Sequence, residues 1–336
     1  MAVPSGESIE TLEDAIVRAA ESTAANVRAA KNVIGTVIFG QERVVERALM
    51  TVLCGGHALL VGLPGLAKTK LVETMGIALG LDARRIQFTP DLMPSDILGS
   101  EVLEEDQGGR RTFRFIPGPV FTQLLMADEI NRASPRTQSA LLQAMQELHV
   151  TVAGARHDLP RPFHVLATQN PIEQEGTYSL PEAQLDRFLM QIDVDYPDQA
   201  AERRIVFDTT GTEESKPKPT MTADELIAAQ RLVRRLPVGE SVVDAILTLV
   251  RSARPGAEAG EIGKLIAWGP SPRASQALML VSRARALLDG RLSPSIDDVL
   301  AMAEPILKHR MALTFAARAD GETVEGVIER LKSRIG

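Results

Sequence analysis

The chain has 336 residues, of which 44% are hydrophobic, and a formal net charge of −7. This length allows a sizeable buried core and indicates two domains. The acidic balance gives no general attraction to nucleic acid or to an anionic membrane. The single cysteine, Cys54, excludes an internal disulfide and fits a reducing compartment. We see no signal peptide and no apolar stretch long enough to span a bilayer, so we expect a cytoplasmic protein without membrane insertion.

The N-terminal part is predicted to be helical. Residues 8–33 carry apolar side chains at the spacing of one helix face. A turn at Gly40 then opens a second helix, and we interpret Cys54, at the end of its apolar stretch, as a small buried hydrophobic residue. We expect residues 1–39 to form an N-terminal helix and linker.

A turn rich in glycine and proline follows the apolar run Ala58–Val61 and leads into a helical segment. The backbone N–H groups of such a turn can surround a phosphate, aided by the positive end of the helix. In this pattern the lysine reaches the β- and γ-phosphates and the threonine hydroxyl binds Mg²⁺. The predicted phosphate-binding loop consists of Gly62, Leu63, Pro64, Gly65, Leu66, Ala67, Lys68, Thr69 and Lys70.

One position departs from the usual loop pattern, because Ala67 stands before the lysine where glycine is usual. We expect Ala67 to hold a negative φ there, or the loop to relax slightly. The alternative interpretation of this segment is an ordinary turn between a strand and a helix, with Lys68 exposed.

Two adjacent acids end a second apolar run, Leu124–Asp128 followed by Glu129. A strand of an open α/β sheet presents such residues at its C-terminal edge, where these sheets bind ligands. Asp128 suits a role in holding the metal ion and Glu129 suits polarisation of the attacking water. Two solvated acids at a strand end are the alternative. Together with the loop, they predict a site that binds and hydrolyses a nucleoside triphosphate.

Strand-like and helical segments alternate up to about residue 198, which favours a mostly parallel sheet of five strands covered by helices. Alternating apolar residues around 107–109 and a second turn at Ala153-Gly154 predict two inserted β-hairpins. We expect an α/β core over residues 40–210. The five predicted strands cover 58–62, 85–89, 124–128, 163–169 and 189–194.

The pattern changes after residue 198. A helix runs to about residue 210, and residues 211–220 form a polar linker rich in proline. From Met221 onward only helices are predicted, so we expect an all-helical lid domain over residues 221–336. Its helices are expected at 222–235, 240–254, 272–288, 295–309 and 322–334.

Four segments resemble the MoxR family of AAA+ ATPases: residues 62–69, 127–147, 167–188 and 269–274. The likeness extends from about residue 40 to residue 310. It implies a P-loop NTPase core of the AAA+ type followed by a lid, with ATP as substrate and Mg²⁺ as cofactor. It also makes Ala67 a trait of the family.

The resemblance also assigns roles to four further residues. Asn170 resembles sensor 1, which reaches the γ-phosphate or the attacking water, although an asparagine at a strand end is often only a turn former. Arg187 resembles an arginine finger for the nucleotide of a neighbouring subunit, but it could equally pair internally with Asp186 or Glu182. Arg273 resembles sensor 2 of the lid, and Gln41 is expected in the adenine pocket.

By the same resemblance, the protein is expected to form a homo-oligomeric ring, with a hexamer as the expected size. Relatives resemble chaperone-like motors that mature enzymes or insert metal cofactors, and a protein with a von Willebrand factor A domain is the expected partner. The hairpins resemble those of an AAA+ subgroup that includes magnesium chelatases and replicative helicases. Two alternatives stay open: a motor stimulated by nucleic acid, which the acidic charge disfavours, and a nucleotide-gated scaffold with little turnover.

The five histidines show no spacing typical of a metal site, and we interpret them as structural. Residues Lys308, His309 and Arg310 are interpreted as a charge cluster that complements the dipole at a helix C-terminus.

Overall fold

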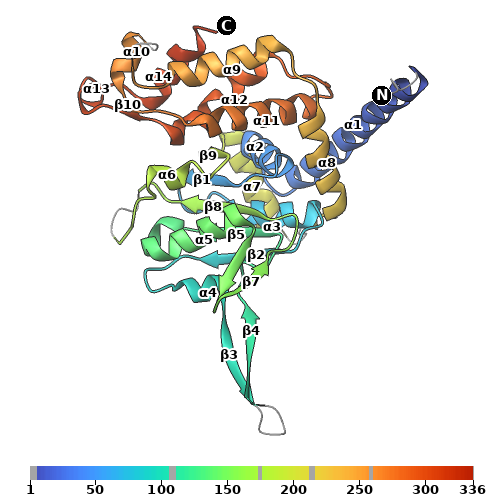
Figure 1. Ribbon diagram of the computed structural model, residues 1–336, viewed down its shortest axis with the longest axis vertical. Coiled ribbons are helices and arrows are strands. Elements are labelled where there is room, and N and C mark those ends of the chain that lie inside the picture. Colours follow the sequence, from blue (N-terminus) through green and yellow to red (C-terminus); the bar gives the residue numbers. More distant parts are fainter. Residues whose placement is uncertain (1–5, 106–110, 173–175, 212–215, 257–259, 336) are drawn as a thin grey trace.

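The computed structural model describes residues 6–105, 111–172, 176–211, 216–256 and 260–335. A sheet covered by helices forms the middle of the molecule, as Figure 1 shows. The helical C-terminal part lies across one end, and a two-stranded ribbon projects from the opposite end.

The central sheet has five parallel strands in the order β2-β5-β8-β1-β9. All five predicted strands are present, and their bounds agree with the prediction to within two residues. The carboxyl ends of all five strands therefore lie at one edge of the sheet. At this edge Asp128 is the last residue of β5 and Glu129 follows it. The strands are β1 (Ala58–Gly62), β2 (Ala83–Gln87), β5 (Leu124–Asp128), β8 (His164–Gln169) and β9 (Met190–Val194).

Two hydrophobic clusters cover the two faces of this sheet, because side chains alternate along a strand. Leu60 and Met126 belong to one cluster, and their neighbours Leu59 and Leu125 belong to the other. The first cluster also contains residues of the helices at both ends of the chain. The helices of the α/β part are α1 (Gly6–Gly35), α2 (Glu42–Leu53), α3 (Lys68–Ala78), α4 (Pro94–Leu98), α5 (Pro135–Glu147), α6 (Glu182–Leu185) and α7 (Gln199–Thr210).

Among its described residues the C-terminal part is helical apart from one short pair of strands, which corrects the prediction of an all-helical lid in this detail. Strands β10 (Ile266–Trp268) and β11 (Ala312–Leu313) pair antiparallel. They are three and two residues long, too short for a pattern of alternation to be visible in the sequence. The helices are α8 (Ala223–Arg235), α9 (Glu240–Ser252), α10 (Glu261–Leu265), α11 (Pro272–Leu288), α12 (Ile296–Leu307), α13 (Phe315–Ala319) and α14 (Val324–Lys332).

The N-terminal helix α1 contacts α2 and α3 of the α/β part and also α8 and α11 of the helical part. The last residue of the predicted linker also contacts the α/β part, since the backbone N–H of Thr220 donates to the carbonyl of Ala78 at 2.8 Å. The domain limits that the sequence suggested at residues 39, 210 and 220 stay predictions. No helix among the described residues is long and apolar enough to cross a membrane.

Both predicted hairpins are present. Strands β3 (Gly99–Glu105) and β4 (Arg111–Pro117) form the projecting ribbon, and its predicted turn at 107–109 lies outside the described residues. Strands β6 (His149–Val152) and β7 (Ala155–Asp158) form the second hairpin. The two hairpins touch, because the ring of Phe115 stacks on His157 with centroids 3.8 Å apart. Farther out, Phe113 is 72% exposed.

Candidate functional site

The predicted phosphate-binding loop connects strand β1 to the N-terminus of helix α3. Ala67 has φ 54° and ψ 20°, so the expected negative φ is wrong: the alanine itself takes the left-handed conformation that glycine usually provides. The Lys68 amine donates to the carbonyl of Gly62 at 2.6 Å. Burial lowers the pKa of Lys68 below its ordinary value, an effect that the nearby carboxylates of Asp128 and Glu129 oppose.

A cavity of about 420 Å³ opens above this loop. It is lined by most of the predicted loop residues and by five residues that lie in, or directly after, the neighbouring strands β2, β5 and β8. Three of the five, Asp128, Glu129 and Asn170, were predicted as site residues, and the structure brings them together with the loop. The other two are Arg85 and Gln87.

The two acids are oriented by a residue that sequence reasoning missed. The Thr168 hydroxyl donates to Asp128 Oδ1 at 2.5 Å, and the backbone N–H of Glu129 donates to the Thr168 oxygen at 2.8 Å. Glu129 has φ 55° and ψ 51°, a conformation that turns the chain sharply at the end of β5. Thr168 lies two residues before Asn170 in strand β8, so only the pairing of β5 with β8 brings it to the acids.

Strand β2 supplies two further polar contacts. Arg85 donates to Asp128 Oδ2 from Nε at 3.1 Å and from Nη2 at 2.6 Å. Gln87 donates to Glu129 Oε2 at 2.7 Å. Both residues fall in the strand predicted at 85–89, but no signal in that segment shows which strand lies next to it. The contacts of Arg85 and Gln87 with the two acids therefore could not be predicted from the sequence.

Asn170 follows strand β8 and is 7% exposed at the edge of the cavity. Its side-chain oxygen accepts a hydrogen bond from the backbone N–H of Ile172 at 3.2 Å, so it also shapes the turn that follows. The position of Asn170 at the cavity suits the predicted sensor role. Its bond to Ile172 is the one that the alternative interpretation, a turn-forming asparagine, expects.

A larger cavity of about 860 Å³ continues from the phosphate-binding loop toward helix α7. Its walls include Ile38, Pro197 and Ile205, which are apolar, and the predicted Gln41. Gln41 donates from its amide to the carbonyl of Asp195 at 2.7 Å. The wall residues suit a flat apolar group such as a purine base.

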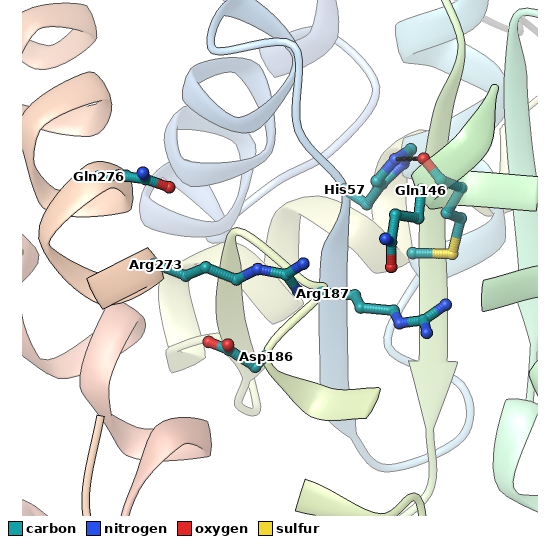
Figure 2. A pocket seen from close by; sticks show the side chains of 7 residues that line it. His57, Gln146, Asp186, Arg187, Arg273 and Gln276 are labelled. Atoms are coloured by element: carbon teal, nitrogen blue, oxygen red, sulfur yellow. Dashed lines mark hydrogen bonds between the residues drawn. The ribbon is translucent and has the colours of Figure 1, made fainter. Parts of the chain in front are cut away.

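Arg187 and Arg273 lie apart from the phosphate cavity. Both line a third cavity, of about 200 Å³, together with His57 and Asp186 among others. Figure 2 shows Arg273 reaching from helix α11 toward the segment that carries Asp186 and Arg187. No described residue forms an ion pair with Arg187, so the alternative of an internal pair with Asp186 or Glu182 is not realised in the part of the chain that the structure describes.

Asp186 has other partners instead. The buried Arg310 donates to Asp186 Oδ1 at 2.7 Å, and the Ser271 hydroxyl donates to Asp186 Oδ2 at 2.8 Å. Ser271 caps helix α11 two residues before Arg273. One carboxylate therefore connects the segment of Arg187 with the helix of Arg273.

Residues 308–310 follow the C-terminus of helix α12, as the interpretation of them as a helix-end charge cluster expects, and Arg310 donates to the last-turn carbonyl of Ile306 at 2.7 Å. Lys308 pairs with Asp193 at 2.7 Å, and the His309 ring lies 3.1 Å from the carbonyl of Phe188. Arg310 is 2% exposed. The cluster also joins the helical part to strand β9 and the residues before it, a contact between segments more than 100 positions apart that no local pattern reveals. Cys54 is buried as predicted, and burial raises its pKa to about 12.

Comparisons with known proteins agree with this geometry. Residues 57–190 match the ATPase family associated with various cellular activities (AAA), and residues 260–331 match the AAA lid domain. The chain is 41% identical to Chaperone MoxR1 of Mycobacterium tuberculosis over 98% of its own length and 87% of the relative. It is 34% identical to Protein MoxR of Paracoccus denitrificans, covering 86% of this chain and 89% of that one.

A solved structure is similar over nearly the full length. It is the crystal structure of a candidate ATPase from Cytophaga hutchinsonii, which is 35% identical with a TM-score of 0.88. The match covers 98% of this chain and 99% of that chain. The α/β core and the helical part are therefore arranged as in that protein.

Proposed function

Because the chain belongs to the MoxR family of AAA+ ATPases, we propose that it is a Mg²⁺-dependent, ring-forming motor that remodels or matures a protein client. Membership makes it a chaperone-like ATPase. The observation that carries the proposal of a ring is that the predicted catalytic residues of one chain are divided between two separate cavities.

The residues of the phosphate cavity have complementary tasks in this proposal. The loop backbone and Lys68 hold the phosphates, and Lys68 would exchange its bond to Gly62 for one to a phosphate oxygen. Glu129 polarises the attacking water and Asn170 orients it beside the γ-phosphate. Gln41 and its apolar neighbours take the base.

The donor set in the phosphate cavity fits Mg²⁺. Thr69 and Asp128 line the cavity and offer a hydroxyl and a carboxylate oxygen. This hard cation prefers oxygen ligands, and at ATP sites it takes only one or two from protein while phosphate and water supply the rest. When bound there, Mg²⁺ would neutralise negative charge on the phosphates.

Arg187 and Arg273 face a different cavity, and in our proposal both act on the nucleotide of the next subunit. The absence of an ion pair between Arg187 and any described residue leaves its guanidinium available for phosphate. A finger of this kind typically contributes ~10³–10⁵ in rate. The bonds of Asp186 to Ser271 and Arg310 would keep the two arginines at a constant separation.

The partner and the client come from the family resemblance. We propose a protein with a von Willebrand factor A domain as the partner, and maturation of a protein, including insertion of a metal cofactor, as the task. The ribbon β3–β4 suits contact with a client, because Leu103 and Phe113 are 50% and 72% exposed on it. The cytoplasmic location stays a prediction.

Mixing two inactive variants tests the shared site. Glu129→Gln keeps Arg187 but lacks the catalytic acid, whereas Arg187→Ala keeps a complete phosphate cavity. We expect each alone to hydrolyse ATP poorly and an equal mixture to recover part of the activity, because an Arg187→Ala cavity then meets an intact Arg187. The control is a mixture of Glu129→Gln with Lys68→Ala, a variant that should not bind ATP. This mixture should stay inactive, because neither variant has a complete phosphate cavity.

The same assay is run over a range of protein concentrations while the particle mass is measured with and without ATP. Specific activity that rises steeply as the mass moves to that of a ring supports the proposal. Constant activity of a persistent monomer, or an Arg187→Ala variant with normal turnover, contradicts it.

A further inference from the structure

The acid predicted to hold the metal ion already binds a cation of the chain. The Arg85 guanidinium contacts Asp128 Oδ2 through two nitrogens, at 2.6 and 3.1 Å. Thr168 donates to the other oxygen, Oδ1. Both oxygens of the Asp128 carboxylate therefore have hydrogen-bond donors. The guanidinium of Arg85 thus contacts the same carboxylate that a metal ion in the phosphate cavity would need as a ligand.

The contact belongs to a chain of bonds that reaches both acids. Arg85 Nη2 also donates to the Gln87 oxygen at 2.8 Å, and the Gln87 amide donates to Glu129 at 2.7 Å. Alternate residues of a strand point to the same side, so residues 85 and 87 of β2 face the acids at the end of β5 together. Arg85 of strand β2 thus compensates the charge of Asp128, whereas the cation paired with Glu129 is Arg132, at 3.1 Å.

Burial differs strongly between the partners. The Asp128 side chain is 12% exposed, whereas that of Arg85 is 48% exposed. A buried carboxylate needs a nearby cation or donors at all times. A half-exposed arginine, in contrast, can leave for water or for a phosphate oxygen at little cost in solvation.

We propose that Arg85 is a positioning residue that competes with Mg²⁺ for Asp128 and surrenders this carboxylate when nucleotide and metal bind together. The inference rests on the proposed function, since it assumes that Asp128 is a ligand of the metal ion. It explains why the side chain lines the phosphate cavity itself. The consequence is a higher metal concentration for tight nucleotide binding than the acids alone would require.

The test is binding of a fluorescent, non-hydrolysable ATP analogue during a titration with Mg²⁺. In Arg85→Gln we expect the Mg²⁺ concentration that gives half of the full gain in affinity to fall about tenfold, because a charged hydrogen-bonded competitor is removed. Binding of Mn²⁺, followed by electron paramagnetic resonance with the same analogue present, should tighten by a similar factor.

Arg84→Gln is the matched control. Arg84 is the preceding residue of β2, points to the other side of the strand and pairs with Asp82 at 3.6 Å. Its replacement removes the same charge without touching Asp128, so the metal requirement should not change. Arg85→Lys keeps the charge but loses the two-nitrogen contact, and an intermediate requirement is expected even where Arg85→Gln lowers the melting temperature.

The outcomes separate the two proposals. A wild-type protein that needs Mg²⁺ for tight binding, together with an unchanged or higher requirement in Arg85→Gln, overturns only the competition. A fall of equal size in Arg84→Gln would reduce the effect to general charge and also overturn it. A wild-type protein that binds the analogue equally with Mg²⁺ and with a chelator overturns the metal role of Asp128, and the competition with it.

Discussion

Two residues beside the phosphate cavity hold backbone conformations that glycine normally provides. Ala67 has φ 54° and Glu129 has φ 55°. A left-handed conformation costs a residue with a Cβ roughly 1–2 kcal/mol. Glu129 needs its side chain for the predicted chemistry, whereas Ala67 contributes only its backbone and a methyl group to the loop.

Replacement of Ala67 by glycine is therefore expected to stabilise the protein by about 1 kcal/mol, the relief of strain being partly offset by a more flexible unfolded chain. Unfolding in urea measures this. Ala153→Gly is the matched control: Ala153 has φ 49° in the turn of the second hairpin, away from the phosphate cavity. Both variants should gain similar stability and keep nucleotide affinity. A loss of stability in Ala67→Gly alone would show that the methyl group is needed.

At the scale of elements, the joint between the helical part and the sheet depends on one buried arginine. Arg310 donates to the carboxylate of Asp186 and to the carbonyls of Asp186, Phe188, Leu189 and Ile306. Desolvation by burial lowers its pKa, and the carboxylate of Asp186 opposes that effect. The arginine thus gathers acceptors from α12, from the segment before β9 and from the neighbourhood of Arg187.

Loss of this arginine should be costly. Arg310→Met keeps much of the volume but removes the arginine donor from a mostly buried carboxylate and four carbonyls, so we expect a loss of about 3–5 kcal/mol of unfolding free energy. Differential denaturant unfolding measures it. Lys264→Met, which breaks the exposed pair with Glu261 in α10, should change stability by less than about 1 kcal/mol. Similar small effects of both replacements would contradict the assigned role.

At the scale of the whole molecule, one hydrophobic cluster runs from α1 through the sheet into the helical part, and buried histidines lie beside it. His57 accepts from the backbone N–H of Val165 at Nδ1 and lies 3.3 Å from the Met145 carbonyl at Nε2. His164 lies 2.9 Å from the Gly56 carbonyl and accepts from the Gln230 amide. Each ring has one donor and one acceptor partner, which only the neutral imidazole can satisfy.

Stability should therefore fall on acidification. Burial lowers the pKa of His57 to about 3 and that of His164 to about 4, and it lowers the pKa of His309 well below the ordinary value. The unfolded chain binds these protons near pH 6.5 and the folded chain does not, so the folded state is fully favoured above about pH 6.5 and loses stability as the pH falls toward 4.

Between pH 7.5 and pH 5.5 we expect a loss on the order of 1 kcal/mol for each of the three histidines. Urea unfolding across this range measures the slope. His164→Gln should make the slope shallower, since one proton fewer is taken up on unfolding. Leu226→Ala, in a buried position of α8 without a titratable group, should lower stability at every pH and keep the slope. Equal slopes in His164→Gln and wild type would contradict the account.

Features encoded in contiguous residues could be predicted from the sequence. Strands β1 and β5 have the predicted bounds, and Lys68, Thr69, Asp128 and Glu129 meet at one cavity because both segments end at the same edge of a parallel sheet. Helix α11 also has its predicted bounds, since a proline and an apolar face mark it locally.

Features that depend on neighbours distant in sequence were decided by the tertiary structure alone. Thr168 and Arg85 reach Asp128 only because β8 and β2 flank β5, and strand order is not encoded in any one strand. The shared cavity of Arg187 and Arg273 likewise required the helical part to dock, through Arg310, on the segment that precedes β9. Local pattern determined which chemical groups this chain has, and long-range packing determined which of them meet, because contacts across a sheet or between domains join segments whose spacing in the sequence carries no periodic signal.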